Sequence, residues 1–221
     1  MTFLVIANFK SNKTQNEVKD WITSVKPSPN MAVAPSFIHL PLFTGTPEHR
    51  NTGILLCAQD VSPFPPGSYT GAVSAKQLKD LKVEYCIVGH SERRRYFHET
   101  TVDIAAKVKE LVGSGITPIV CMEENDIAPQ FAALDDEYYD KCLYCFEPSA
   151  DIGGTTTASA ESITSVKQKI EQFVPGARFM YGGSVNADNI DSLLPLGLSG
   201  VLVATACLDP ISFNSILAKL S

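Results

Sequence analysis

The stretch IVGHSERR, residues 87–94, begins with residues that suit a buried strand and ends with four ionisable groups in five positions. The chain is therefore expected to pass from a buried strand directly to a polar segment. Seven further apolar runs occur along the sequence with amphipathic segments between them, which is the pattern of repeated βα units in a parallel sheet. The eight expected strands are residues 3–7, 31–34, 54–59, 85–89, 117–121, 142–146, 178–182 and 200–204.

Helical periodicity fills most of the gaps between these runs, and Asn186 and Asp209 are candidate N-caps. Because the strands are almost uniformly apolar, both faces of the sheet are expected to be covered. This favours an α/β fold of the (β/α)8 barrel type, a single domain over residues 1–221, rather than an open doubly wound sheet. The chain is shorter than the roughly 250 residues typical of that fold, and residues 122–141 leave room for only one short helix. The expected helices are residues 14–26, 74–81, 101–115, 159–173, 186–197 and 209–220.

The composition narrows the class of protein. Hydrophobic residues make up 44% and charged residues 19% of the chain, which is ordinary for a globular protein with a sizeable core. A net charge of −6 does not favour nucleic acid as a partner. No apolar run approaches the length of a membrane span, and no signal peptide leads the sequence, so we expect a cytoplasmic protein.

The six cysteines lie mostly in apolar runs. Cys142 and Cys145 form a C-x-x-C pair, which could indicate a redox or metal motif. However, strand alternation would direct the two side chains to opposite faces of the sheet. We therefore interpret the cysteines as structural.

Polar residues follow several of the expected strands, at the end of the barrel where such folds place their active sites. Asn8 and Lys10 follow the first strand, His90 the fourth and Glu147 the sixth, and residues 182–184 form a Gly-Gly-Ser turn after the seventh. Each has a plain structural interpretation, such as a solvated lysine or a hydrogen-bonded histidine. Their convergence at one end of a barrel makes coincidence the weaker explanation.

This combination of groups predicts a reaction. A carboxylate can remove a proton next to a carbonyl group, an imidazole can polarise the carbonyl oxygen, and a lysine can stabilise the developing negative charge. Glycine-rich turns that open onto helix N-termini suit a phosphate. We therefore expect enolisation of a small phosphorylated carbonyl compound, without an external cofactor or metal.

Five motifs, spread over nearly the whole chain, resemble those of the triosephosphate isomerase family in their order and spacing. The resemblance implies interconversion of dihydroxyacetone phosphate and D-glyceraldehyde 3-phosphate, a step of glycolysis and gluconeogenesis. It also implies the roles known for that family, with Glu147 as the proton-shuttling base and His90 as a neutral electrophile. Lys10 and Asn8 would hold the substrate and stabilise the enediolate. The motifs are NFK (8–10), CAQDVSPFPPGSYTGAVS (57–74), IVGHSERR (87–94), FEPSADIGG (146–154) and YGGSVNADNI (181–190).

The family pattern also assigns supporting roles. Ser91 and Glu92 would begin a short helix whose positive end keeps His90 neutral, and Glu92 would lie against Lys10. Arg93 and Arg94 are interpreted as scaffold residues that form ion pairs.

The implied phosphate contacts are Gly153 in a mobile lid, Ser184, and the turn at Ala204 and Thr205. The last pair departs from the family pattern, which has two glycines there, and the added β-carbons restrict the backbone and crowd a phosphate. The lid departs as well, because Ala150 replaces its usual tryptophan and Asp151 follows. These departures predict weaker substrate binding at a retained site.

Residues 60–71 resemble the loop with which family members form dimers, so we expect a homodimer. An exposed rigid turn is the alternative. Two alternative functions also stay open: isomerisation of another small phosphorylated sugar, and binding of a phosphorylated metabolite with reduced activity.

Overall fold

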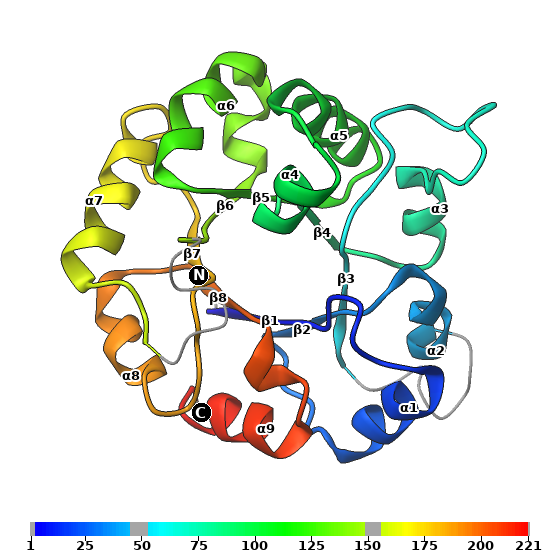
Figure 1. Ribbon diagram of the computed structural model, residues 1–221, viewed down its shortest axis with the longest axis vertical. Helices are drawn as coiled ribbons and strands as arrows, with labels where there is room; N and C mark the ends of the chain where they lie inside the picture. The colour runs from blue at the N-terminus through cyan, green and yellow to red at the C-terminus, as the bar shows by residue number, and fades with distance from the viewer. Residues whose placement is uncertain (1–2, 45–52, 149–155, 221) are drawn as a thin grey trace.

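The computed structural model describes residues 3–44, 53–148 and 156–220, and its centre is a closed barrel of eight parallel strands in chain order (Figure 1). The barrel closes because β1 pairs with both β2 and β8, so that Val5 lies opposite Met31 on one side and Val201 on the other. The strands are β1 (Leu4–Asn8), β2 (Met31–Ala34), β3 (Leu55–Ala58), β4 (Tyr85–Val88), β5 (Thr117–Met122), β6 (Leu143–Phe146), β7 (Phe179–Tyr181) and β8 (Gly200–Val203). The predicted fold class is confirmed, and every strand ends within one residue of its expected bounds.

Helices surround the barrel on its outside (Figure 1). Three of them begin with a capping box, in which Thr14, Ser74 or Thr100 accepts a hydrogen bond from the amide three residues later. Asp209 caps the last helix as predicted. The α-helices are α1 (Gln15–Ser24), α2 (Pro41–Thr44), α3 (Ala75–Asp80), α4 (Ser91–Tyr96), α5 (Thr101–Gly113), α6 (Ile127–Ala133), α7 (Ala160–Glu171), α8 (Ile190–Leu193) and α9 (Pro210–Ala218).

The hydrophobic core has two layers because successive strand residues point to opposite faces. In β1, Leu4 and Ile6 belong to the layer inside the barrel, whereas Val5 and Ala7 pack against the surrounding helices. This explains why the strands are apolar throughout. Gly200 permits the closure of the barrel, since a β-carbon there would lie 2.1 Å from the carbonyl oxygen of Leu4.

The connection from β5 to β6 contains one short α-helix, α6, as the sequence predicted, flanked by 3-10 turns at Glu124–Asp126 and Asp136–Lys141. The predicted start of the helix at residues 186–197 is wrong. The side-chain oxygen of Asn186 accepts hydrogen bonds from the amides of Asp188 and Asn189, and residues 187–189 form a turn ahead of the helix. The α-helix begins only at Ile190.

Cys142 and Cys145 lie on opposite sides of the sheet, Cys142 in the outer layer and Cys145 inside the barrel. All six cysteines are buried and free. The structural interpretation of the C-x-x-C pair therefore agrees with its geometry. Across the described residues, none of the helices has both the length and the apolar character needed to cross a membrane.

Candidate active site

A cavity of about 420 Å³ opens at the carboxyl ends of the strands. Of the predicted site residues, Ser91 does not line it, and Gly153 lies outside the described residues, together with Ala150 and Asp151 of the expected lid. The predicted residues that line the cavity are Asn8, Lys10, His90, Glu92, Glu147, Ser184, Ala204 and Thr205.

Lys10 has an unusual backbone conformation, with a φ of 49° in the left-handed region. Neighbouring side chains hold it there. Asn8 accepts a hydrogen bond from the Lys10 amide at 3.0 Å, and Gln59 donates to the carbonyl oxygens of Lys10 and Ala34 at 2.9 and 2.8 Å. The Lys10 ammonium lies 2.7 Å from Oε1 of Glu92, as the resemblance implied.

His90 is the residue that precedes α4, and its Nδ1 accepts a hydrogen bond from the backbone amide of Glu92 at 3.1 Å. A ring nitrogen that accepts from an amide carries no proton, so the neutral ring places its proton on Nε2. That nitrogen lies 3.2 Å from Oε1 of Glu147. The imidazole is therefore oriented to donate a hydrogen bond into the cavity.

Two opposing effects act on the pKa of His90. Burial lowers it, while the facing carboxylate of Glu147 raises it, and the net effect of burial and charge is an increase. The amide bond to Nδ1 opposes protonation, because a proton on that nitrogen would break the bond. Glu92 also raises the pKa of His90, by a smaller amount than Glu147, and the ammonium of Lys10 lowers it.

Glu147 follows β6 and is only 3% exposed. Its Oε1 faces His90, and its Oε2 is buried without a hydrogen-bond partner among the described residues. Gly182 makes room for it, since a β-carbon at that position would lie 3.0 Å from Cγ of Glu147. The Gly-Gly-Ser turn thus provides space for the carboxylate as well as a turn.

The described residues of the predicted phosphate site also line the cavity. Ser184 has a left-handed φ of 49°, and its carbonyl oxygen accepts hydrogen bonds from the side-chain amides of Asn186 and Asn189. Ala204 precedes the 3-10 turn Thr205–Cys207 with a φ of −108°, where a β-carbon causes no left-handed strain. Ala204, which stands where the family pattern has a glycine, is therefore expected to crowd the ligand and not to strain the backbone.

The two arginines have structural contacts, in agreement with their interpretation as scaffold residues. Arg93 lies 2.7 Å from Asp60, and Arg94 donates to the carbonyl oxygens of Gly89 and Cys121 at 2.8 and 3.1 Å. The role of Gln59 as a support for Lys10 was missed from the sequence. Its position, as the polar last residue of the third expected strand (54–59), is the signal that could have found it.

The fold and the arrangement of ionisable groups around the cavity define a (β/α)8-barrel isomerase. A sequence profile of the triosephosphate isomerase family matches residues 3–220. The chain belongs to the triosephosphate isomerase family.

Curated relatives agree with this assignment. The chain is 34% identical over 244 residues to the triosephosphate isomerase of Thermus thermophilus, with 97% of each chain covered. It is 33% identical to that of Mesomycoplasma hyopneumoniae over 99% of this chain and 100% of the relative, and 34% identical to that of Polynucleobacter asymbioticus over 96% and 97%. These alignments are longer than the 221 residues of the chain, so the relatives contain segments that this chain lacks. They support the main functional interpretation over its two alternatives.

Proposed function

We propose that the protein interconverts dihydroxyacetone phosphate and D-glyceraldehyde 3-phosphate through an enediolate. Glu147 removes a proton from the carbon next to the carbonyl group and returns it to the neighbouring carbon. The Nε2–H of His90 donates to the carbonyl oxygen, and Lys10 stabilises the negative charge that develops on it. The observation that carries this proposal is the 3.2 Å separation of Nε2 of His90 and Oε1 of Glu147 at one cavity wall.

Asn8 supports Lys10 in this scheme and contributes to substrate binding. Glu92 has two positioning roles, because its side chain pairs with Lys10 and its amide fixes the ring of His90. Ser91, the first residue of α4, supports the same turn from outside the cavity. No cofactor takes part in the proposed steps.

The phosphate of the substrate is proposed to bind at Ser184 and at the turn of Ala204 and Thr205, with Gly153 of the lid as a third contact. The β-carbon of Ala204 leaves less room there than a glycine would. We expect an elevated KM for glyceraldehyde 3-phosphate and detectable methylglyoxal from enediolate that escapes. A normal KM without detectable methylglyoxal would contradict weakened binding of the phosphate.

A coupled assay with both triose phosphates on the purified protein tests the function. Turnover in both directions supports it, and Glu147→Gln should abolish the turnover without loss of folding. Turnover of a different phosphorylated sugar alone would indicate the first alternative function. Binding of triose phosphates without turnover would indicate the second.

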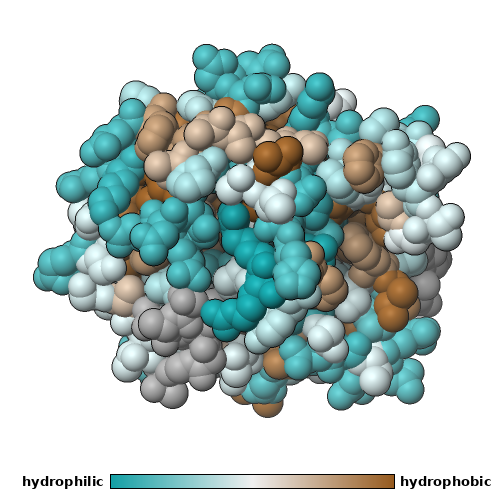
Figure 2. All heavy atoms as spheres, turned by 45° about the horizontal axis from the view of Figure 1, so that its top comes forward, coloured by the Kyte–Doolittle hydropathy of each residue, from teal (hydrophilic) through white to brown (hydrophobic). Residues whose placement is uncertain are grey.

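A homodimer through residues 60–71 is proposed as the functional form. This loop projects away from the barrel beyond α3 (Figure 1), and its aromatic rings of Phe64 and Tyr69 stack on each other while 48% and 43% exposed. The face drawn in Figure 2 also has hydrophobic side chains exposed in separate places on a mainly hydrophilic surface. Burial of such side chains by a second copy would stabilise the pair. Light scattering at micromolar concentration tests this, and a monomeric mass would contradict it.

A cytoplasmic location and a single domain are proposed for the protein. The reaction belongs to glycolysis and gluconeogenesis, so a cytoplasmic location is proposed, and fractionation of the cells that make the protein would test it.

Residues 1–221 are proposed to form one domain. A single calorimetric unfolding transition is expected, and two separated transitions would contradict it.

A further inference from the structure

Two buried cysteines lie on the interior wall of the barrel beside Glu147. Cys121 of β5 and Cys145 of β6 are register partners in neighbouring parallel strands, so their side chains leave the sheet side by side. Both belong to the layer inside the barrel. Glu147 comes two residues after Cys145, and strand alternation directs it to the same side.

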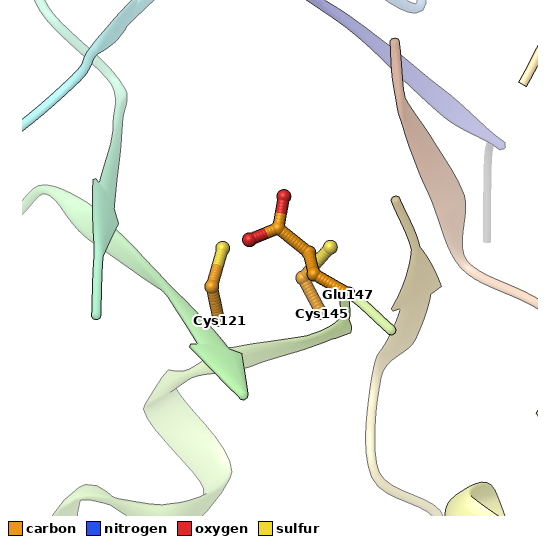
Figure 3. A group of neighbouring side chains, drawn as sticks. All are labelled: Cys121, Cys145 and Glu147. Carbon is orange, nitrogen blue, oxygen red and sulfur yellow. The ribbon is translucent and has the colours of Figure 1, made fainter. Parts of the chain in front are cut away.

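The three side chains converge. One ligand atom from each, two sulfurs and a carboxylate oxygen, lie within 4.8 Å of one another. Figure 3 shows the sulfur of Cys121 facing the carboxylate of Glu147, with Cys145 beside them. Cys121 and Cys145 belong to two adjacent strands of a closed barrel and Glu147 directly follows one of them, so the barrel fixes their backbone positions.

Hydrogen-bond donors around the carboxylate are sparse, and the neighbour that interacts with it is the thiol of Cys121, which is a weak donor. Oε2 of Glu147 is buried and lacks a hydrogen-bond partner within the part of the chain that the structure describes. A buried polar atom in this state costs free energy, and native structures usually have a reason for it. A cation bound between the carboxylate and the two sulfurs would satisfy it.

We propose that Cys121, Cys145 and Glu147 form a binding site for a single thiophilic cation such as Zn²⁺. Thiolates and a carboxylate are ligands that zinc accepts in proteins. Tetrahedral zinc with Zn–S bonds of about 2.3 Å separates two sulfurs by about 3.8 Å, so modest side-chain rotation brings the present group to coordination geometry. Each thiol releases its proton to solvent as its sulfur binds. The fourth ligand is a water molecule from the cavity that Glu147 lines.

This site would regulate the reaction, and that consequence rests on the proposed function. A cation that holds the carboxylate of Glu147 withdraws the base from the substrate. Zn²⁺ therefore inhibits turnover reversibly, and a chelator restores it. The cation is an inhibitor here and takes no part in the proposed chemistry.

The site is tested by metal binding, which does not depend on activity. Isothermal titration of the reduced, full-length protein with Zn²⁺ is expected to show one tight site per chain, and Cd²⁺ should give the ultraviolet absorption band of cadmium–thiolate bonds. Cys121→Ser and Cys145→Ala should each weaken binding by at least about tenfold. Cys142→Ser is the matched control, because Cys142 lies in the same segment but on the outer face of the sheet. It should bind like the unmodified protein.

Several results would overturn the proposal. One is the absence of the cadmium–thiolate band in the unmodified protein. Another is binding of Zn²⁺ by Cys121→Ser or Cys145→Ala as tightly as by the unmodified protein. A third is loss of binding in Cys142→Ser. Because the cadmium band is measured on the unmodified protein, it tests the site even if a variant fails to fold. Binding without any isomerase activity would refute the proposed function while leaving the metal site standing.

Discussion

Glu147→Asp shortens the proposed base by one methylene group, which withdraws the carboxylate by about 1.5 Å. In the structure, Oε1 of Glu147 lies 3.2 Å from Nε2 of His90, so the shorter side chain ends beyond hydrogen-bond distance of the same ring. A displacement of about 1 Å can cost about 100-fold in rate. We therefore expect kcat/KM to fall by about 100-fold, which corresponds to about 2.7 kcal/mol of transition-state stabilisation.

The assay is steady-state kinetics with each triose phosphate as the substrate and with the coupling enzyme in excess. The loss should appear mainly in kcat, because the proposed phosphate contacts at Ser184 and Ala204 are unchanged. Glu84→Asp is the matched control, since Glu84 is exposed and precedes β4 at the opposite end of the barrel from the cavity. The reasoning is refuted if folded Glu147→Asp retains kcat/KM within about threefold of the unmodified protein.

Gln59 supports the active site, and Thr100 caps α5. Gln59→Leu removes two hydrogen bonds, one of them to the carbonyl oxygen of Lys10, and each is worth about 1 kcal/mol. The lysine should lose its left-handed conformation, and kcat/KM should fall at least about tenfold, whereas a change below twofold would show that Gln59 does not position it. Thr100→Ala removes the cap of α5 and should cost about 1 kcal/mol of unfolding free energy in urea titrations. Hydrogen bonds from Thr100 lower the pKa of Asp103, so this carboxylate stabilises the fold above its ordinary pKa and loses that effect as pH falls through the lowered value. The variant should therefore lose less stability in acid than the unmodified protein, and equal acid sensitivity would contradict the assignment.

The strands were predictable because their apolar runs reflect two buried faces. Each run ends where the barrel ends, which also revealed Asn8, His90 and Glu147 as residues at one rim. The order of the strands follows from the repeated βα pattern, since right-handed crossovers place successive strands side by side. Fold and site thus share one sequence signal, the change from apolar to polar residues at a strand end.

Other features depend on contacts that no local pattern encodes. The Lys10 carbonyl oxygen accepts a hydrogen bond from Gln59, which follows β3, and nothing around Lys10 in the sequence indicates this contact. Asn186 lies before a turn that precedes the late start of α8, and it is a residue type that favours caps and turns alike. The juxtaposition of Cys121 and Cys145 depends on strand register, which is set only when the barrel closes.

In the proposed reaction Glu147 moves a proton next to a carbonyl group while His90 and Lys10 stabilise the oxygen. Incubation of the purified protein with dihydroxyacetone phosphate in D₂O, followed by proton NMR of the products, tests this. We predict isomerisation with deuterium incorporated at the carbon next to the carbonyl, and neither reaction in Glu147→Gln. A protein that binds the substrate yet neither isomerises it nor incorporates deuterium would contradict this proposal.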